Sequence, residues 1–257
     1  MNLGAFGTET KSPFLSGLIR RVLPLFCCGL ILLCGCGSKE DPVLVREQKM
    51  IKEGVEILRS GTAVQRDSVI RTFYKIENSD LLYPYLYDPD PNVQIGVVSA
   101  LGYLKDSSAA GALNDLLKNV DDYLLQETII YALGEISDTS SVPILIDMMK
   151  DDSVSRDLRL SIPITLAAFA KTPAASRVEQ AFIDLLENRS EDIELCSYVA
   201  VGILEVLKPS NVERFRKYLP LLRQMAEKRK ASSGEDGIWS NFQLTIQELE
   251  SYKTPAS

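Results

Sequence analysis

The sequence predicts an all-α solenoid in which about six helix pairs stack in chain order and coil into a right-handed superhelix. Three observations predict this fold class. A segment recurs every 32 to 35 residues, the apolar residues of each copy keep helical spacing, and a helix-capping residue stands at the same place in each copy. Together they indicate one helical unit repeated along the chain.

The period is plainest in Ala100-Leu-Gly-Tyr-Leu-Lys-Asp106 and Ala132-Leu-Gly-Glu-Ile-Ser-Asp138, which are 32 residues apart. Aligned on these segments, the copies have anchor residues at Leu101, Leu133, Leu166 and Val201. The positions eight and four before the anchor and three after it are apolar at all but one of twelve places. This spacing describes one face of an α-helix, so each copy should bury one helical stripe.

A capping residue stands eleven positions before each anchor: Asp90, Asp122, Ser155 and Ser190. These side chains accept hydrogen bonds from the free backbone N–H groups of a helix start. An earlier copy fits the same frame, with Phe73 as anchor and Thr62 as cap. Each second helix of a pair should therefore begin just after its cap.

Another helical segment precedes each of these helices and completes the pair. Three such segments are Ala109–Lys118, Val142–Lys150 and Ser176–Asn188. Pro143 stands in a first turn, where proline is tolerated, whereas Pro163 and Pro220 fall inside predicted helices and should kink them. The predicted pairs cover residues 43–78, 79–106, 107–138, 139–171, 172–208 and 209–253.

The pattern Asp88-x-Asp-x-Asn-Val-x₆-Ala-Leu-Gly-x-Leu-x-Asp106 resembles the HEAT-like repeat of the phycobilisome-lyase type. The resemblance covers roughly residues 62–207, and it implies that the second helices line a concave face. The family often has Arg directly after the Val, but here that column reads Gln94, Gln126, Arg159 and Glu194. A regular Asp–Arg ladder is therefore in doubt. Tetratricopeptide arrays, whose signature is not in register, are the alternative.

Residues 1–35 have the pattern of an export signal. Arg20 and Arg21 precede an uncharged run of 17 residues from Val22 to Ser38, which contains Pro24 and three glycines. A basic region followed by a short apolar run and small residues is typical of a cleaved signal. The run is at the lower limit for crossing a bilayer, so an uncleaved membrane anchor is the weaker alternative.

Leu33-Cys34-Gly35-Cys36 resembles the lipobox of bacterial lipoproteins. The resemblance implies diacylglycerol on Cys36, cleavage before it and a third acyl chain on the new amine; two or more chains hold a protein firmly in a bilayer. It also implies a cell-envelope location, at the outer membrane facing the periplasm or at the cell surface. Residues 36–42 would be the lipidated tether, 43–253 the solenoid and 254–257 a disordered tail.

The composition excludes several classes of activity. The sequence has no His, which excludes Ser–His and Cys–His nucleophile pairs and His-ligated zinc. Removing residues 1–35 takes away one acid and three bases, so the formal charge changes from −7 to −9, which disfavours nucleic acid as a partner. Beyond the lipid on Cys36, no cofactor, metal site or catalytic residue is expected.

Acidic pairs recur at the turns: Asp88/Asp90, Asp121/Asp122, Asp151/Asp152 and Glu191/Asp192. Carboxylates suit calcium, but helix capping explains them without a cation. Cys196, the one cysteine after Cys36, falls in a column with Gly96, Thr128 and Ser161. Small residues there favour a packing role.

Candidate partner-binding residues lie on the second helices, two places before and after the anchors. This row reads Ser99/Tyr103, Tyr131/Glu135, Ile164/Ala168, and Val199/Glu205 if the last copy slips one place. Tyrosine beside charge is a common interface mixture, so Tyr103, Tyr131, Glu135 and the nearby Glu127 are the candidates. Ordinary solvated surface is the alternative.

Residues 208–230 hold eight bases and two acids, a net charge of +6. Arg214, Arg216 and Lys217 form a possible basic patch that would contact anionic headgroups or an acidic partner. The alternative is a solvated helix face.

These observations favour a membrane-anchored exported lipoprotein that acts as a non-catalytic protein-interaction scaffold. Its partners would be the lipid bilayer and an unidentified protein. Two alternatives stay open: an envelope component that binds peptidoglycan or polysaccharide, and a subunit of a lyase-like enzyme.

Overall fold

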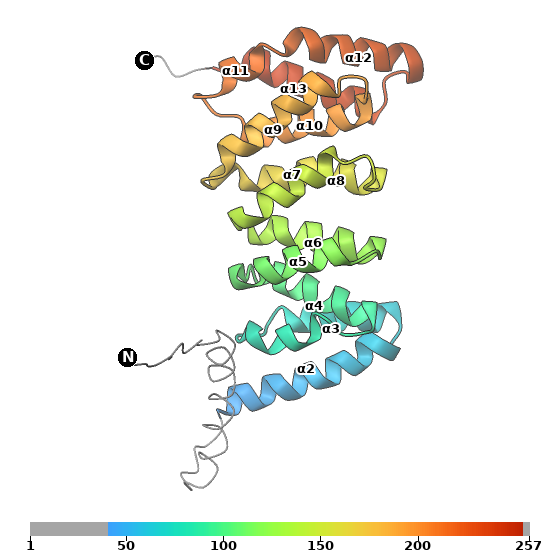
Figure 1. Ribbon diagram of the computed structural model, residues 1–257, viewed down its shortest axis with the longest axis vertical. Coiled ribbons are helices and arrows are strands. Elements are labelled where there is room, and N and C mark those ends of the chain that lie inside the picture. Colours follow the sequence, from blue (N-terminus) through green and yellow to red (C-terminus); the bar gives the residue numbers. More distant parts are fainter. Residues whose placement is uncertain (1–40, 254–257) are drawn as a thin grey trace, which may run out of the picture. The chain divides into compact units, whose positions relative to one another are not determined.

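A computed structural model describes residues 41–253, and this part of the chain is all-α, with no strand. The helices follow one another as pairs in chain order (Figure 1), as the predicted solenoid requires. The predicted signal peptide, Cys36 with its lipobox, and the tail 254–257 lie outside the described residues and stay predictions. Within residues 41–253, no helix is both long enough and apolar enough to cross a membrane.

The helices form two layers. The first helices of the pairs are α2 (Pro42–Ser60), η2 (Ser79–Tyr85), α5 (Ala110–Asn119), α7 (Val142–Lys150), α9 (Ala175–Asn188), α11 (Val212–Arg216) and α12 (Leu219–Ser233). The second helices are α3 (Ala63–Phe73), α4 (Pro91–Tyr103), α6 (Tyr123–Ile136), α8 (Arg156–Ala167), α10 (Ile193–Val206) and α13 (Gly237–Ser251). Short 3₁₀ turns precede α5 and α7 and follow α8: η3 (Ser107–Ala109), η4 (Thr139–Ser141) and η5 (Ala168–Lys171). Each second helix from α4 onward packs on the next second helix of the series.

Four of the five predicted caps are confirmed. The side chains of Asp90, Asp122 and Ser155 accept from backbone N–H groups in the first turns of α4, α6 and α8. Thr62 and Gln65 form a reciprocal capping box at the start of α3. The anchors that follow these caps (Phe73, Leu101, Leu133 and Leu166) are fully buried. A side-chain cap therefore fixes which face of each helix enters the core.

The predicted cap of α10 is wrong by two residues. Asp192, and not Ser190, accepts from the Leu195 N–H at 3.2 Å. The backbone N–H of Asp192 donates to the Arg189 carbonyl at 2.9 Å. Ser190 therefore lies inside a turn and not at the start of the helix. Asp192 also pairs with Arg156 of α8 at 3.0 Å, which holds it at the helix start.

The anchor of α10 consequently moves from Val201 to Ile203. The three flanking core positions become Leu195, Val199 and Val206, all of them buried, whereas Val201 is only half-buried. The suggested pairing of Val199 with Glu205 in the outer row is corrected to Val201 with Glu205. The greater length of α9, 14 residues against 9 for α7, accounts for the shift, because the helical spacing within α10 is unchanged.

The new register also corrects the place of Cys196. It belongs to the column of Gln94, Gln126 and Arg159, where it takes the place assigned to Glu194. It does not belong to the small-residue column. Each member of this column binds the loop that precedes its helix. Gln94 donates to the Leu86 carbonyl at 3.0 Å, and Gln126 donates to the Val120 carbonyl at 2.8 Å.

Arg159 and Cys196 continue the same column in α8 and α10. Arg159 pairs with Asp152 at 2.7 Å, and the Cys196 thiol donates to the Arg189 carbonyl at 3.3 Å. Because the four side chains share one task, chemically different residues occupy one structural position. Cys196 thus ties a loop to a helix as well as filling the core.

The prolines behave differently from one another. Pro143 lies in the first turn of α7, as predicted. Pro220 also lies in a first turn, that of α12, because α11 ends at Arg216 and α12 begins at Leu219. The prediction that Pro220 interrupts a helix is therefore wrong. Pro163 does lie inside α8, where it is buried.

The α10 register makes a testable contrast between two neighbouring residues. Ile203→Ala should lower the free energy of unfolding by about 2–5 kcal/mol, because the side chain is fully buried. Val201→Ala should cost roughly 1 kcal/mol, since part of that side chain stays in water. Urea unfolding of the two variants measures the difference. A larger loss of unfolding free energy for Val201→Ala than for Ile203→Ala would support Val201 as the anchor of α10.

Burial also makes a prediction about thiol chemistry. Burial raises the pKa of the Cys196 thiol to about 12, and the charges of Asp192 and Glu191 add to the rise. The thiolate is the reactive form, so iodoacetamide at pH 8 should leave Cys196 unmodified in the folded chain and label it after unfolding. Peptide mapping by mass spectrometry measures this. Equal labelling rates before and after unfolding would contradict the buried, hydrogen-bonded thiol.

Candidate interaction surface

One row of residues on the second helices lies outside the core. We define this second-helix row as the positions two before and two after each anchor from α4 onward, with Ile203 as anchor in α10 and Ile246 in α13. Before the anchors it holds Ser99, Tyr131, Ile164, Val201 and Leu244; after them it holds Tyr103, Glu135, Ala168, Glu205 and Glu248. None of these ten side chains is buried. The row crosses five helices that pack one on the next.

Small residues bring the helices that carry the row close together. A Cβ added to Gly102 of α4 would lie 2.7 Å from the Cβ of Ala132 in α6, closer than side chains can approach. The backbones of α4 and α6 therefore meet beside Tyr103, which follows Gly102, and Tyr131, which precedes Ala132. The sequence repeat thus places the two predicted tyrosines on adjacent helices.

The tyrosines are part of an aromatic cluster that the sequence did not reveal. The ring of Tyr74, which follows α3, stacks on the ring of Tyr103, with centroids 3.8 Å apart and planes at 11°. Burial raises the pKa of Tyr74, whereas the positive charge of Arg71 lowers it. The phenols of Tyr131 and Tyr103 add to the rise. Tyr103 and Tyr131 nevertheless keep 58% and 67% of their surface exposed, so their rings are available for contact.

The two predicted carboxylates, Glu127 and Glu135, lie one helical turn from Tyr131 and have different partners. Glu135 pairs with Lys105 at 3.7 Å across the α4–α6 boundary. Burial raises the pKa of Tyr123, one turn before Glu127, and a hydrogen bond to Glu127 adds to the rise. Glu127 is exposed. All four predicted partner-binding residues therefore lie at one region of the second-helix layer.

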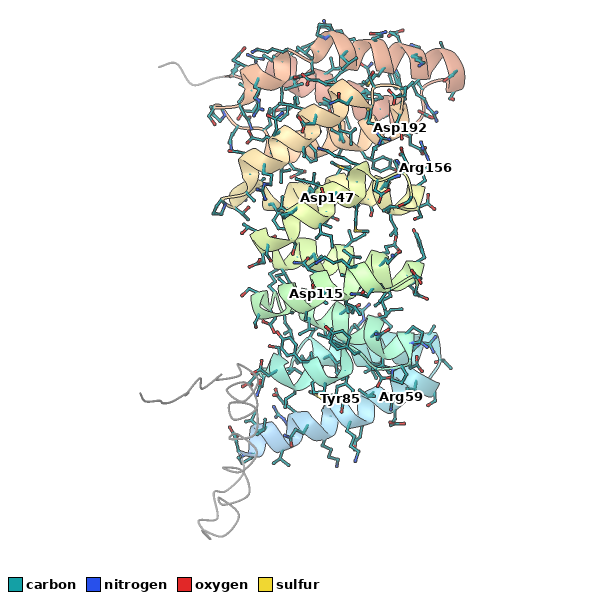
Figure 2. The ribbon with its side chains drawn as sticks, in the orientation of Figure 1. Arg59, Tyr85, Asp115, Asp147, Arg156 and Asp192 are labelled. Atoms are coloured by element: carbon teal, nitrogen blue, oxygen red, sulfur yellow. The ribbon has the colours of Figure 1, made fainter. Side chains whose placement is uncertain are left out.

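Each acidic turn has at least one carboxylate that accepts a hydrogen bond from a backbone N–H group. Besides the caps described above, the carboxylate of Asp88 accepts from the Asp90 N–H and that of Asp151 from the Ser153 N–H. Figure 2 shows Arg156 beside Asp192, where one guanidinium joins α8 to the start of α10. Among residues 41–253, no group of three His, Cys, Asp or Glu side chains is placed to hold a metal ion.

The predicted basic patch is largely engaged in internal contacts. Arg216 donates to the Leu249 and Tyr252 carbonyls at 2.7 and 2.5 Å, which fixes the end of α13. Arg214 lies 3.9 Å from the buried carboxylate of Glu179. Only Lys217 of the three is exposed with no ion-pair partner in the described part of the chain. The remaining pairs are Lys208–Glu179, Arg223–Glu250, Arg229–Asp236 and Lys230–Glu235.

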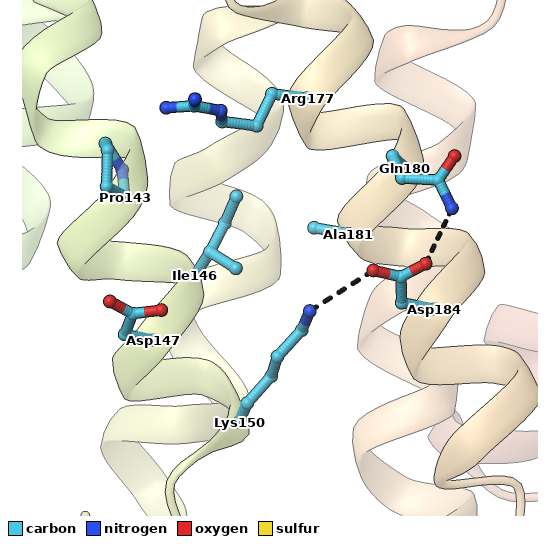
Figure 3. Close-up of a pocket in the computed structure, with 8 residues that line it drawn as sticks. All are labelled: Pro143, Ile146, Asp147, Lys150, Arg177, Gln180, Ala181 and Asp184. Carbon is cyan, nitrogen blue, oxygen red and sulfur yellow. Dashed lines mark hydrogen bonds and ion pairs between the residues drawn. The ribbon is translucent and has the colours of Figure 1, made fainter.

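A pocket of about 490 Å³ lies between α7 and α9 in the first-helix layer (Figure 3). Its apolar lining includes Ile146, and Lys150 pairs there with Asp184 at 3.3 Å. Figure 3 shows Arg177 reaching from α9 toward α7. No sequence pattern indicated this pocket, because the recurring columns belong to the second helices. Its central charges neutralise each other, so it has less to offer a charged ligand than the second-helix row.

The repeat architecture agrees with a known family over part of the chain. A family model for HEAT repeats matches residues 79–167, from η2 to the end of α8. This segment contains all four predicted partner-binding residues. No curated protein matches the sequence. With the stacked helix pairs of residues 41–253, the match makes this an all-α, HEAT-like solenoid.

Proposed function

We propose that this protein is an exported lipoprotein whose HEAT-like array is a non-catalytic scaffold for a protein partner. The observation that carries the proposal is the second-helix row, an exposed strip that mixes aromatic, aliphatic and acidic side chains across consecutive helices. Stacked repeats present extended surfaces of this kind, which suit protein contacts better than small-molecule chemistry.

The anchor in this proposal is the acylated Cys36, which would hold the array in the cell envelope, at the outer membrane facing the periplasm or at the cell surface. The support is the lipobox resemblance at the end of an uncharged run. A tether of residues 36–42 would then leave the whole array in the aqueous compartment. Anchoring confines the scaffold to a surface and so raises its effective concentration toward a partner there.

The proposal of a non-catalytic role has its own support. The sequence offers no His for acid–base or nucleophilic chemistry. The buried Cys196 thiol is held in its protonated form, which is the unreactive one. Covalent lipid on Cys36 is the one non-protein group that the proposal requires.

The anchor is tested by Cys36→Ser. The acceptor sulfur for diacylglycerol is then missing, so the variant should accumulate as an unprocessed precursor and lose its partition into the detergent phase. Phase separation and the size of the chain on a gel measure both effects. Cys34→Ser is the matched control and should be processed normally. Normal processing and membrane retention of Cys36→Ser would contradict the anchor.

The scaffold is tested by placing a photo-crosslinking amino acid at Tyr131 in intact cells. We expect a discrete crosslinked protein, because this ring is exposed at the centre of the candidate surface. The same amino acid at Val45, an exposed apolar residue on α2 in the first-helix layer, should not give that product. Identical products at both positions would contradict the proposal, and crosslinks to cell-wall glycan alone would replace it with the polysaccharide-binding alternative.

A further inference from the structure

We infer that the partner docks through an amphipathic helix with basic flanks, laid across α6, α8, α10 and α13. This inference rests on the proposed function, since it specifies the partner chemistry of the same surface. Two parts of the second-helix row carry it. We call them the apolar track (Tyr131, Ile164, Val201 and Leu244) and the acidic track (Glu135, Glu205 and Glu248).

The apolar track is an exposed strip that the fold itself does not use. Tyr131, Ile164 and Leu244 keep 67%, 45% and 56% of their surface exposed, and Val201 is half-buried. They occur one per helix on four helices that pack in series. Single exposed apolar residues are ordinary on a protein surface, but apolar residues at one position of four consecutive packed helices indicate a contact site.

The charge of these four helices selects the sign of the partner. They carry seven acids and two bases, which are Arg156 and Arg159. Both arginines are already paired, Arg156 with Asp192 and Glu194 and Arg159 with Asp152. On the acidic track, Glu205 and Glu248 have no ion-pair partner among residues 41–253. A segment with Lys or Arg beside its apolar residues complements this surface and would be steered toward it.

Backbone chemistry selects a helix over an extended segment. The faces of α6, α8, α10 and α13 offer no free backbone groups, because helical N–H and C=O groups are bonded within each helix. An extended segment laid there would lose water from its own backbone without a replacement partner, whereas a helix satisfies its backbone internally.

The spacing of the track fits such a helix. Packed helices lie about 8–10 Å apart, and seven residues of an α-helix rise about 10.5 Å. A docked helix would therefore meet the track with one apolar residue every seven, in the manner of helix-in-groove recognition.

A second copy of this chain is a poor occupant. Its densest run of cations is residues 208–230, and six of the eight bases there are already ion-paired within the chain. Those side chains hold Glu179, Glu213, Glu235, Asp236 and Glu250 and cannot serve the acidic track without breaking these contacts. This internal pairing favours a different protein as the source of the complementary charge.

The test uses the full chain in nanodiscs of zwitterionic lipid and a fluorescent peptide of about 22 residues, long enough for three helix-to-helix steps. The probe has Leu at every seventh position and on the same helical face, flanked by Lys. Two control peptides are a scrambled sequence of the same composition and a version with Glu in place of Lys. Fluorescence anisotropy, corrected for empty nanodiscs, should show binding of the probe and of neither control.

Two pairs of variants are matched to surface controls. Tyr131→Ser with Leu244→Ser removes apolar contact, and Val64→Ser with Tyr87→Ser removes comparable exposed apolar area away from the track. We expect the first pair to weaken probe binding about tenfold or more, because aromatic and apolar anchors dominate interface energy. The control pair should stay within about twofold, as peripheral contacts do. Circular dichroism confirms that each variant is folded.

The charge variants follow the same design. Glu205→Gln with Glu248→Gln should weaken binding and flatten its salt dependence, because screened attraction is what salt removes. Asp121→Asn with Asp147→Asn, which neutralises exposed acids away from the row, should do neither. Equal binding of the scrambled peptide, or no effect of either track pair, would overturn the inference. A protein captured at Tyr131 that lacks a basic amphipathic helix would overturn it and leave the scaffold standing, whereas capture of no protein would overturn both.

Discussion

The fold depends on where each second helix starts. A capping side chain fixes the first turn, and the helix then carries its stripe into the core eleven residues later, at Leu101, Leu133 and Leu166. Each second helix packs on the next. A shifted helix start would therefore expose the apolar stripe of that helix and disrupt its packing against the neighbouring helix. The capping hydrogen bonds are individually modest, about 1 kcal/mol each, but they select the register on which a much larger burial depends.

Most of the array could be predicted because its signals are local. Caps, apolar stripes and the period all lie within single repeats, so α3, α4, α6, α7 and α8 begin at the residues that the sequence predicted. The start of α10 could not be predicted, because Ser190 and Asp192 are both good caps. The choice between them depends on the Arg189 turn and on Arg156, which stands 36 residues away. Glu194 was assigned to the column of Gln94 in place of Cys196 for the same reason.

The surface shows the same division between local and distant information. The outward positions of Tyr103 and Tyr131 follow from the period and could be predicted. Tyr74 stacks on Tyr103 because α3 packs against α4. No sequence pattern near Tyr74 predicts this contact. The charge of residues 208–230 was counted correctly from the sequence. Its pairing with acids of other helices, such as Arg223 with Glu250, depends on folding and reduces the charge available to a partner.

This pairing determines what the array can offer to other molecules. Bases tie helix to helix, as Arg156 does between α8 and α10 and Arg216 does at the end of α13. The acids of the second-helix row, by contrast, are largely left to solvent, since they exceed the bases on those helices. Stability and surface charge are thereby carried by different residues. The outer row can vary toward a partner while the caps and anchors that fix the register stay in place.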